Sequence, residues 1–379
     1  MPDYANTKMP LPDGKVIEVR RYPFREQELH QAWDNADLML LKWFEESCDT
    51  KPSGVLVVND SFGGLALGLG GAYTHSWGDS YVGLRSLEEN TLHSLGKGYE
   101  GVFIPAHMPP PEGFGVVLIK LPKNHDLFLS QLSQLREMLP TNAVVMAGIM
   151  AKDLNRTVVS RVESLGFEVS VSLAWKKARL LTMAKTNDLK DNSTRTHMRQ
   201  FHLHDPQLVV KGHPGVFSIN KADEGGVLLT KEVPQGERGV MVDLGCGNGM
   251  VGAAMAFHNP EAKVILVDES YLAVDSARQT FAANQLEGDF HFRVTDCLSA
   301  VTEKADWVFC NPPFHAGRTL DYSTSLRMFS QAKNILKPTG QLVVVGNRHL
   351  NYHIHLKKIF PKAQSGSKHA KFVVFRCQL

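Results

Sequence analysis

The chain has 379 residues, of which 43% are apolar and 21% are charged, and its formal net charge is +2. This length suggests two domains, and the composition excludes a disordered chain because it provides enough apolar side chains for packed cores. No run approaches the roughly 20 apolar residues of a membrane span, and the start lacks the apolar stretch of a signal peptide. Five scattered cysteines without a C-x-x-C pair disfavour a disulfide framework and a zinc cluster. We therefore expect a cytoplasmic protein with no membrane association and no metal.

The small net charge conceals an asymmetry along the chain. After Asp321 there is no acidic residue, whereas the same segment contains ten lysines and arginines. Subtracting these ten from the net charge of +2 leaves −8 on the preceding residues. A localised basic segment of this kind indicates a surface that faces an anion.

Strand and helix patterns alternate along the chain. In the first half, buried-strand patterns lie at 54–58, 115–119 and 143–146, and a helical pattern covers 126–138. The second half repeats this alternation, with a helical pattern at 271–283 and strand patterns at 240–242, 263–267, 290–294, 307–309, 341–345 and 372–375. Alternating strands and helices predict an α/β fold in which doubly wound, mostly parallel sheets are covered on both faces.

The two halves resemble each other in sequence. Three pairs of segments match at a slowly increasing offset: 57–64 with 241–249, 78–81 with 267–271, and 119–122 with 309–312. We interpret the chain as two tandem copies of one fold. Because 187–238 is polar and rich in turns, we expect a first copy at 1–188, a linker at 189–238 and a second copy at 239–379.

A glycine-rich turn follows the first strand of the second copy. It reads Val242-Asp-Leu-Gly-Cys-Gly-Asn-Gly249 and precedes a helical pattern, while Asp268 ends the next strand. Glycines let backbone N–H groups approach a ligand closely, and the acid is placed to accept hydrogen bonds from ribose hydroxyls. This pattern predicts a cofactor that contains adenosine, without separating nicotinamide from other such cofactors.

Two further features favour S-adenosylmethionine. The carboxylate of Asp243, directly before the turn, would repel a pyrophosphate and attract a sulfonium or ammonium group. Asn311-Pro-Pro-Phe314 ends the fourth strand, where the Asn311 side-chain oxygen and the Pro312 carbonyl could accept hydrogen bonds from an exocyclic amine. The ring of Phe314 offers a face on which a base could stack.

These motifs, together with Thr295-Asp296 after the third strand, resemble class I S-adenosylmethionine-dependent methyltransferases acting on exocyclic amines. Within that class the chain resembles the bacterial ribosomal RNA guanine-N2-methyltransferases from end to end, and most closely those of the large subunit. The further segments that carry this likeness are 174–180, 216–218 with Asp223 and Gly225, 346–350 and 357–360.

The resemblance implies two tandem Rossmann-like class I methyltransferase folds, of which the first is degenerate. Ser61 and Phe62 replace Gly245 and Cys246, and 121–123 replaces the Asn-Pro-Pro motif, so the first copy would serve RNA recognition or scaffolding. The implied catalytic residues are Asn311, Pro312, Pro313 and Phe314. The implied cofactor-binding residues are Asp243, Gly245, Cys246, Gly247, Asn248, Gly249, Asp268, Asp296 and Asn311.

By the same resemblance, Asp268 binds the ribose, Asp296 binds the adenine amine, and the segment around Phe217 and Ser218 covers the cofactor. The substrate would be large-subunit ribosomal RNA, naked or partly assembled. The sequence does not determine the oligomeric state, for which we favour a monomer. We expect phosphate contacts from Lys176, Lys177, Arg179, Arg348, Lys357 and Lys358.

Several histidines lie near these motifs. We expect His315 to order its loop or to contact phosphate rather than to act as a base, because the amine loses its proton only after it has become positively charged. The histidines at 349, 353 and 355 lack a nearby cysteine or acid, so we expect no metal site there.

Alternatives remain open at this stage. The same motif suits a guanine of the small-subunit RNA, and it also suits adenine-N6, cytosine-N4 or glutamine-amide methylation. A nicotinamide-dependent dehydrogenase would explain the glycine-rich turn but leaves Asn311-Pro-Pro-Phe314 without a role. A non-enzymatic RNA-binding module fits the first copy and does not explain the intact second one.

Overall fold

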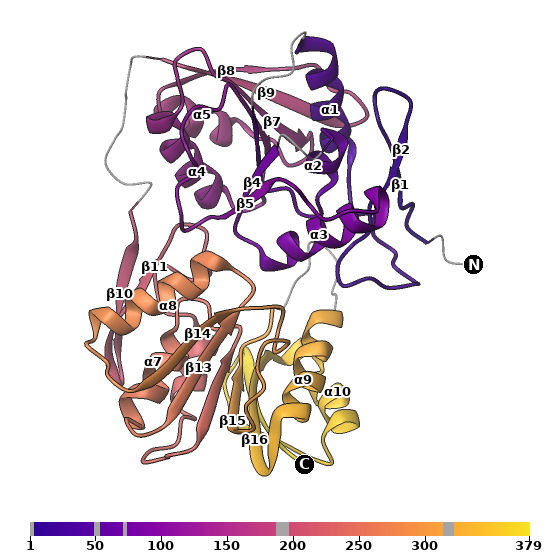
Figure 1. Cartoon of the computed structure of the whole chain (residues 1–379). Coiled ribbons are helices and arrows are strands. Elements are labelled where there is room, and N and C mark those ends of the chain that lie inside the picture. The colour runs from indigo at the N-terminus through magenta and orange to yellow at the C-terminus, as the bar shows by residue number, and fades with distance from the viewer. Residues whose placement is uncertain (1–3, 49–53, 71–73, 187–196, 314–321) are drawn as a thin grey trace. The chain divides into compact units, whose positions relative to one another are not determined.

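The computed structural model describes residues 4–48, 54–70, 74–186, 197–313 and 322–379. The chain divides into two compact units, Met1–His197 and Met198–Leu379. Each unit contains one mostly parallel sheet with helices on both faces (Figure 1), so the predicted α/β fold is confirmed.

The first unit is built on a seven-stranded sheet with the order β5-β4-β3-β6-β7-β9-β8. The first five of these strands are parallel, and β9 runs antiparallel to both of its neighbours. The strands are β3 (Val55–Val58), β4 (Thr74–Gly78), β5 (Val102–Pro105), β6 (Val116–Lys120), β7 (Val144–Met150), β8 (Phe167–Val171) and β9 (Ala178–Lys185). The helices are α1 (Asn35–Ser47), α2 (Gly64–Gly68), α3 (Tyr81–Leu95), α4 (His125–Met138) and α5 (Arg156–Ser164).

The second unit has a sheet of the same order, β14-β13-β12-β15-β16-β18-β17, with the same strand directions. Its strands are β12 (Val240–Leu244), β13 (Lys263–Asp268), β14 (Asp289–Val294), β15 (Ala305–Cys310), β16 (Leu336–Asn347), β17 (Lys362–Lys368) and β18 (Phe372–Gln378). Its helices are α6 (Glu224–Thr230), α7 (Met250–His258), α8 (Tyr271–Ala283), α9 (Ser323–Ile335) and α10 (Tyr352–Ile359), with a short 3-10 helix at Arg348–Leu350.

The likeness between the units extends to a hairpin and a helix that precede each sheet. In the first unit the hairpin is β1 (Lys8–Pro10) with β2 (Val16–Glu18), and in the second it is β10 (Arg199–His204) with β11 (Gln207–Gly212). Strand β2 contacts α3 as β11 contacts α8, and α1 contacts β7 and β9 as α6 contacts β16 and β18. The prediction of two copies of one fold is therefore confirmed, and the segment expected as a linker contributes three elements to the second copy.

A polar side chain of one helix binds each hairpin at the same place. In the first unit, the side chain of Asn90 accepts a hydrogen bond from the Arg20 N–H and donates one to the Arg20 carbonyl. In the second, the Thr280 hydroxyl likewise accepts a hydrogen bond from the Lys211 N–H at 3.0 Å. The hairpin is thus fixed to its helix through backbone groups, which leaves the hairpin sequence free to diverge.

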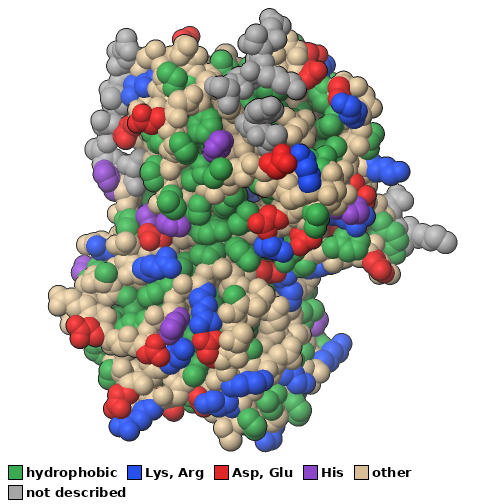
Figure 2. Space-filling view, viewed as in Figure 1, with side chains coloured by type: hydrophobic (Ala, Val, Ile, Leu, Met, Phe, Trp, Pro, Cys, Tyr) green, Lys and Arg blue, Asp and Glu red, His purple; other side chains and the backbone are tan. Residues whose placement is uncertain are grey.

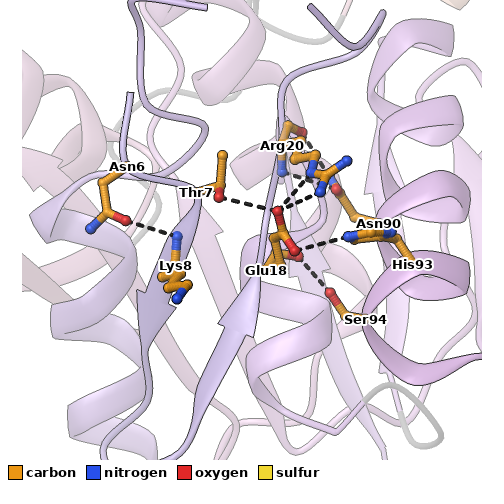
Figure 3. A network of polar contacts seen from close by, with 8 residues as sticks. All are labelled: Asn6, Thr7, Lys8, Glu18, Arg20, Asn90, His93 and Ser94. Carbon is orange, nitrogen blue, oxygen red and sulfur yellow. Dashed lines mark hydrogen bonds and ion pairs between the residues drawn. The ribbon is translucent and has the colours of Figure 1, made fainter. Parts of the chain in front are cut away.

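A network of polar contacts around Glu18 orients this junction in the first unit (Figure 3). Its carboxylate accepts hydrogen bonds from Thr7, Arg20 and the ring of His93. Partial burial opposes ionisation of Glu18, but the contacts with His93 and Arg20 outweigh it and lower the pKa of this carboxyl. The ion pairs are partly exposed, so we attribute to them orientation of the hairpin more than stability.

Each sheet buries both of its faces. Within β12, Met241 packs into the cluster beneath α7 and α8, whereas Val242 packs into the opposite cluster beneath α9 and α10. Both side chains are fully buried, and such burial stabilises by about 1.5–3 kcal/mol for each large apolar side chain. This explains why the central strands read as continuous apolar runs in the sequence. Within the described ranges, no helix combines the length and apolarity that crossing a membrane requires.

Candidate active site

Four parallel strands of the second unit bring the predicted cofactor and amine residues to one edge of the sheet. The glycine-rich turn follows β12, and Asp268 ends β13. Asp296 and Asn311 follow β14 and β15, which lie in the same sheet in parallel register. The carboxyl edge of an open parallel sheet is where such folds bind ligands.

The turn after β12 depends on glycine for two different reasons. Gly245, Gly247 and Gly249 all have positive φ, at 76°, 52° and 77°. A Cβ on Gly249 would lie 2.8 Å from the Cα of Ala277, so this residue allows α7 and α8 to approach each other. A Cβ on Gly247 would meet no described atom within 4 Å, so the turn is open on that side. An open, side-chain-free face at the start of α7 fits a ligand that approaches the backbone.

Asp268 is held against this turn. Its Oδ2 accepts a hydrogen bond from the Gly247 N–H at 2.9 Å, and its Oδ1 accepts one from the Ser270 N–H at 3.0 Å. Burial raises the pKa of the Asp268 carboxyl, and these backbone donors oppose that effect. Each carboxylate oxygen has further lone-pair capacity, so hydroxyl donors of a ribose fit here.

Asp243 is buried behind the turn. Its Oδ2 accepts a hydrogen bond from the Gly252 N–H at 2.8 Å. Burial raises the pKa of Asp243 to about 7, with a further contribution from the charge of Asp268, and the Gly252 contact lowers it. A cationic group of a ligand near this carboxylate would favour its ionised form, in agreement with the expected sulfonium or ammonium neighbour.

Asn248 connects the turn to the segment expected to cover the cofactor. Its Nδ2 donates to the Ser218 carbonyl at 3.3 Å, and its own carbonyl accepts a hydrogen bond from the Thr280 hydroxyl at 2.8 Å. The neighbouring Phe217 is 64% exposed, which is unusual for a phenylalanine. Cys246 is buried, and burial raises the pKa of its thiol well above the ordinary value. A covering role for Phe217 stays a prediction.

Asp296 has a partner that the sequence did not indicate. Both of its oxygens accept hydrogen bonds from Arg327 of α9, each at 2.6 Å. The carboxylate is buried, and a bidentate pair of this kind fixes its plane. No local signal joins the two residues, because they are 31 positions apart and meet only through the order of β14, β15 and α9. The contact of Asp296 with adenine stays a prediction.

Asn311 presents an unsatisfied acceptor. Its Nδ2 donates to Asp223 Oδ2 at 3.0 Å, whereas its Oδ1 is buried and has no hydrogen-bond partner in the described part of the chain. Pro312 is buried, and Pro313 is exposed with its carbonyl accepting a hydrogen bond from the Ser325 hydroxyl at 3.4 Å. A buried acceptor without a partner is costly unless a ligand supplies the donor. The predicted residues Phe314 and His315 lie outside the described residues.

The first unit lacks the chemical groups that define this edge of the second. Asn59 holds the position of Gly245. The Asn59 N–H donates to the Trp77 carbonyl of the neighbouring strand, as the Gly245 N–H donates to the Val267 carbonyl. The expected alignment of Ser61 with Gly245 is therefore wrong by two positions, and Ser61 corresponds to Gly247. The strand registers also show that Gly78 holds, in the first unit, the position that Asp268 holds in the second.

Lys120 corresponds to Asn311 in the same way, since Val58 pairs with Ile119 as Leu244 pairs with Cys310. The expected match of Leu121-Pro-Lys123 to the Asn-Pro-Pro motif is therefore displaced by one position. The turn of the first unit is occupied by Asp60, which accepts hydrogen bonds from Gly63 and Ala66 and whose pKa burial raises to about 6. The first copy is thus degenerate at the turn, at the ribose acid and at the amine acceptor.

The residues expected to contact RNA lie mostly on the surface. Lys176 and Lys177 are exposed in the β8–β9 loop and have positive φ, at 46° and 66°. Arg179 is partly buried and donates to the Ser172 carbonyl at 2.9 Å. Arg348, Lys357 and Lys358 are exposed in the second unit. Figure 2 shows basic and acidic side chains interspersed on the visible face of the molecule. Among the described residues, no group of three or more His, Cys, Asp or Glu is placed to hold a metal ion.

Comparison with known proteins identifies the class. Residues 207–376 match the family model of the methyltransferase small domain, and residues 7–187 match that of the RLMG N-terminal domain. A solved T. thermophilus structure described as a 16S rRNA N2 methyltransferase (RsmC), in complex with AdoMet and guanosine, has the same fold. It covers 98% of this chain and 97% of its own, with a TM-score of 0.75 and 21% identity. The chain is an enzyme of the methyltransferase class.

Two curated relatives define the family more narrowly. A protein of Shewanella loihica named ribosomal RNA large subunit methyltransferase G is 35% identical over 95% of this chain and 92% of its own length. The protein of the same name from Shewanella denitrificans is also 35% identical, over 96% of this chain and 97% of its own length. This chain belongs to the ribosomal RNA large subunit methyltransferase G family, as its resemblance to large-subunit enzymes predicted.

Proposed function

We propose that the second unit transfers a methyl group from S-adenosylmethionine to the exocyclic N2 amine of a guanine in large-subunit ribosomal RNA. The observation that carries this proposal is the buried Oδ1 of Asn311, which has no hydrogen-bond partner among the described residues and lies at the sheet edge that also holds the glycine-rich turn. Family membership supports both the reaction class and the large-subunit substrate.

The residues of the turn fit the cofactor. The backbone at Gly247 allows the cofactor to approach closely because no Cβ is present there, and Asp268 accepts hydrogen bonds from the ribose hydroxyls. Burial raises the pKa of Asp243 to about 7, and the cationic groups of the cofactor favour its ionised form. When bound, S-adenosylmethionine supplies a methyl group on a sulfonium, which is an electrophile toward an amine. The protein then has to position the amine and to adjust its electron density.

Asn311 and Pro312 perform this second task. The lone pair of a guanine amine is delocalised into the ring, and acceptors placed at its hydrogens favour a pyramidal nitrogen on which the lone pair is available. The Asn311 Oδ1 and the Pro312 carbonyl are the acceptors at this position. Catalysis arises from positioning and from these fixed dipoles, so no general base is required before the new bond forms.

Surface residues of the first unit support contact with RNA. In the β8–β9 loop, Leu173 is 89% exposed. The ring of Trp175 in the same loop lies beneath two ammonium groups, those of Lys176 and of Lys42 from α1. Cations beside aromatic surface are suited to phosphate and base stacking together. The target guanine has to be unpaired or flipped out to reach Asn311. We place this reaction in the cytoplasm, favour a monomer as the acting species and expect it to need no metal ion.

The main rival is a guanine of the small subunit, because the enzyme of like fold is named for 16S RNA. The higher identity to relatives named for the large subunit favours the latter. A dehydrogenase has no support from either family model.

Labelled-methyl transfer to purified ribosomal RNAs tests the substrate. The chain is incubated with labelled S-adenosylmethionine and with large-subunit RNA, small-subunit RNA or assembled subunits, and N311A serves as the inactive control. We expect label in naked or partly assembled large-subunit RNA. Label confined to small-subunit RNA, or equal label with N311A, would overturn the proposal.

A further inference from the structure

Asp223 has no assigned role in the reaction, although it is the partner that the described residues provide for the Asn311 amide nitrogen. The contact joins Asn311 Nδ2 to Asp223 Oδ2 at 3.0 Å. The two residues lie 88 positions apart, one before α6 and the other after β15. The contact therefore results from the packing of α6 onto the sheet.

The orientation of the Asn311 side chain decides whether it can act on an amine. An amide has an acceptor oxygen on one side and a two-hydrogen donor on the other. If the group were rotated by half a turn, its NH₂ would face the substrate NH₂, and neither could accept from the other. A carboxylate offers only acceptors, so it binds the Nδ2 side of Asn311 and not the Oδ1 side. We propose that Asp223 is a positioning residue that orients Asn311 with its Oδ1 toward the substrate amine.

Asp223 is itself held in place. It caps the N-terminus of α6, where the same Oδ2 accepts a hydrogen bond from the Gly226 N–H at 2.8 Å. A Cβ on Gly225 would lie 3.1 Å from this Oδ2, closer than ordinary contacts allow. The second residue after the acid is thus a glycine, at a position where a side chain would crowd the carboxylate. One oxygen therefore receives two donors in a fixed geometry, which restricts the rotamer of Asn311.

The first unit shows that this connection belongs to the fold. There Asp34 caps α1, the counterpart of α6, and its Oδ1 accepts a hydrogen bond from Lys120 Nζ at 2.5 Å. Lys120 occupies the position of Asn311. The aspartate and its cap persist in the degenerate copy, but its partner there is an ammonium group, which has donors only. Lys120 thus presents no acceptor to an amine, whereas Asn311 at the same position binds the aspartate through its NH₂ and keeps its oxygen as an acceptor.

Two substitutions separate the capping role from the positioning role. Ser, Asn and Asp cap helices about equally well, so D223S and D223N both preserve α6. In D223N the amide oxygen takes the place of Oδ2 and still accepts from Asn311, whereas the hydroxyl of D223S is too short to reach it. We expect D223S to lower the single-turnover methylation rate about 100-fold, as misplacement of a catalytic group does, and D223N by less than about fivefold.

This inference rests on the proposed function, so the experiment includes a readout that is independent of turnover. Guanosine affinity is measured by calorimetry in the presence of S-adenosylhomocysteine for the full chain, D223S, D223N and N311A. We expect D223S to weaken guanosine binding as N311A does, and D223N to retain it. Asn155 caps α5 of the first unit in the same manner. N155A therefore reports the effect of a lost cap alone, and we expect it to leave both measurements unchanged.

A double-mutant cycle completes the test, because residues that act as one unit are not additive. In the N311A background, D223S should lower the rate no further. The inference is overturned if D223S lowers the rate by the same factor with or without Asn311, if D223N is as impaired as D223S, or if D223S retains wild-type rate and guanosine affinity. A wild-type chain that methylates no guanine contradicts the proposed function instead, and the guanosine titrations then decide the role of Asp223.

Discussion

Lys120 stands in the first unit at the position that Asn311 occupies in the second. Lys120 follows Ile119, which pairs with Val58 at the end of β3. Asn311 follows Cys310, which pairs in the same way with Leu244 at the end of β12. The ammonium of Lys120 forms ion pairs with Asp34 at 2.5 Å and with Asp37 at 2.7 Å. The place of an amine acceptor is therefore filled by an internal salt bridge, which gives the degenerate copy a structural use for its former site.

Replacing Lys120 should destabilise the first unit. K120M leaves Asp37 buried without its cation, and removal of one partner of a buried ion pair is strongly unfavourable. We expect the free energy of unfolding of the first unit, measured by chemical denaturation, to fall by about 3 kcal/mol. The exposed Lys123 provides the control, because K123M should stay within about 0.5 kcal/mol of wild type. Equal transitions for the two variants would contradict a stabilising role for the salt bridge.

Alanine substitutions at three glycines of the second unit distinguish the effects of backbone strain, helix packing and ligand contact. Gly236, Gly247 and Gly249 all have positive φ, so each change to alanine costs about 1 kcal/mol for the backbone alone. G249A should destabilise further, because its Cβ would meet the backbone of Ala277. G247A should be as stable as G236A but should bind S-adenosylmethionine at least about tenfold more weakly, because its Cβ enters the open face of the turn. Thermal unfolding and calorimetric binding check these results, and equal cofactor affinity for G247A and G236A would refute the contact at Gly247.

Asp243 should make stability depend on pH. Its folded-state pKa is about 7 and its ordinary value 3.8, so between these pH values the folded chain holds a proton that the unfolded chain has lost. The stability from neutral Asp243 is therefore fully present below pH 3.8 and is lost as the pH rises through 7. We expect the difference in unfolding free energy between wild type and D243N to fall by about 4 kcal/mol across this window. The opposite sign, or a constant difference, would show that Asp243 is already ionised in the folded chain.

Arg327 should affect cofactor affinity more than methyl transfer. R327K keeps the positive charge but replaces the two-point contact with Asp296 by a single donor. If Asp296 binds the adenine amine, the Kd for S-adenosylmethionine should rise about tenfold while kcat at saturation changes little.

Arg293 and Glu303 form a matched bidentate pair elsewhere in the same unit. R293K should leave cofactor affinity unchanged. A fall in kcat for R327K without a change in Kd would place Arg327 at the amine site instead.

The exposed lysines of the β8–β9 loop should contribute to RNA affinity through phosphate contacts. K176A/K177A should weaken RNA binding and reduce the slope of log affinity against log salt by roughly 0.7–0.9 for each lysine. Lys15 is exposed but already paired with Asp13 at 2.7 Å, so K15A should leave the slope unchanged. Filter binding at several salt concentrations measures the slopes, and identical slopes would remove this loop from the RNA surface.

The residues whose shared position at one sheet edge the sequence indicated are those whose signal is local, and their binding roles stay predictions. The glycines of the turn, Asp268 and Asn311 each lie at the end of a strand within a recognisable motif, and parallel strands bring such ends together. The repeated sheet was predictable for the same reason, because strand and helix patterns recur in the same order.

Contacts that depend on tertiary packing could not be predicted. The Asp296–Arg327 and Asn311–Asp223 contacts join residues 31 and 88 positions apart, and no periodicity connects them. The alignment of Ser61 with Gly245 failed because it compared the two segments by sequence alone, whereas the strand register that places Asn59 there is visible only in the sheet.

The most direct test of the central claim is identification of the methylated nucleoside. Large-subunit RNA is incubated with the chain and S-adenosylmethionine carrying a deuterated methyl group, digested, and analysed by mass spectrometry. A single deuterated product, N2-methylguanosine, absent with N311A, is the predicted result. Deuterated methyl groups on adenine N6 or cytosine N4, or N2-methylguanosine formed equally by N311A, would contradict the assignment of Asn311 as the acceptor for a guanine amine.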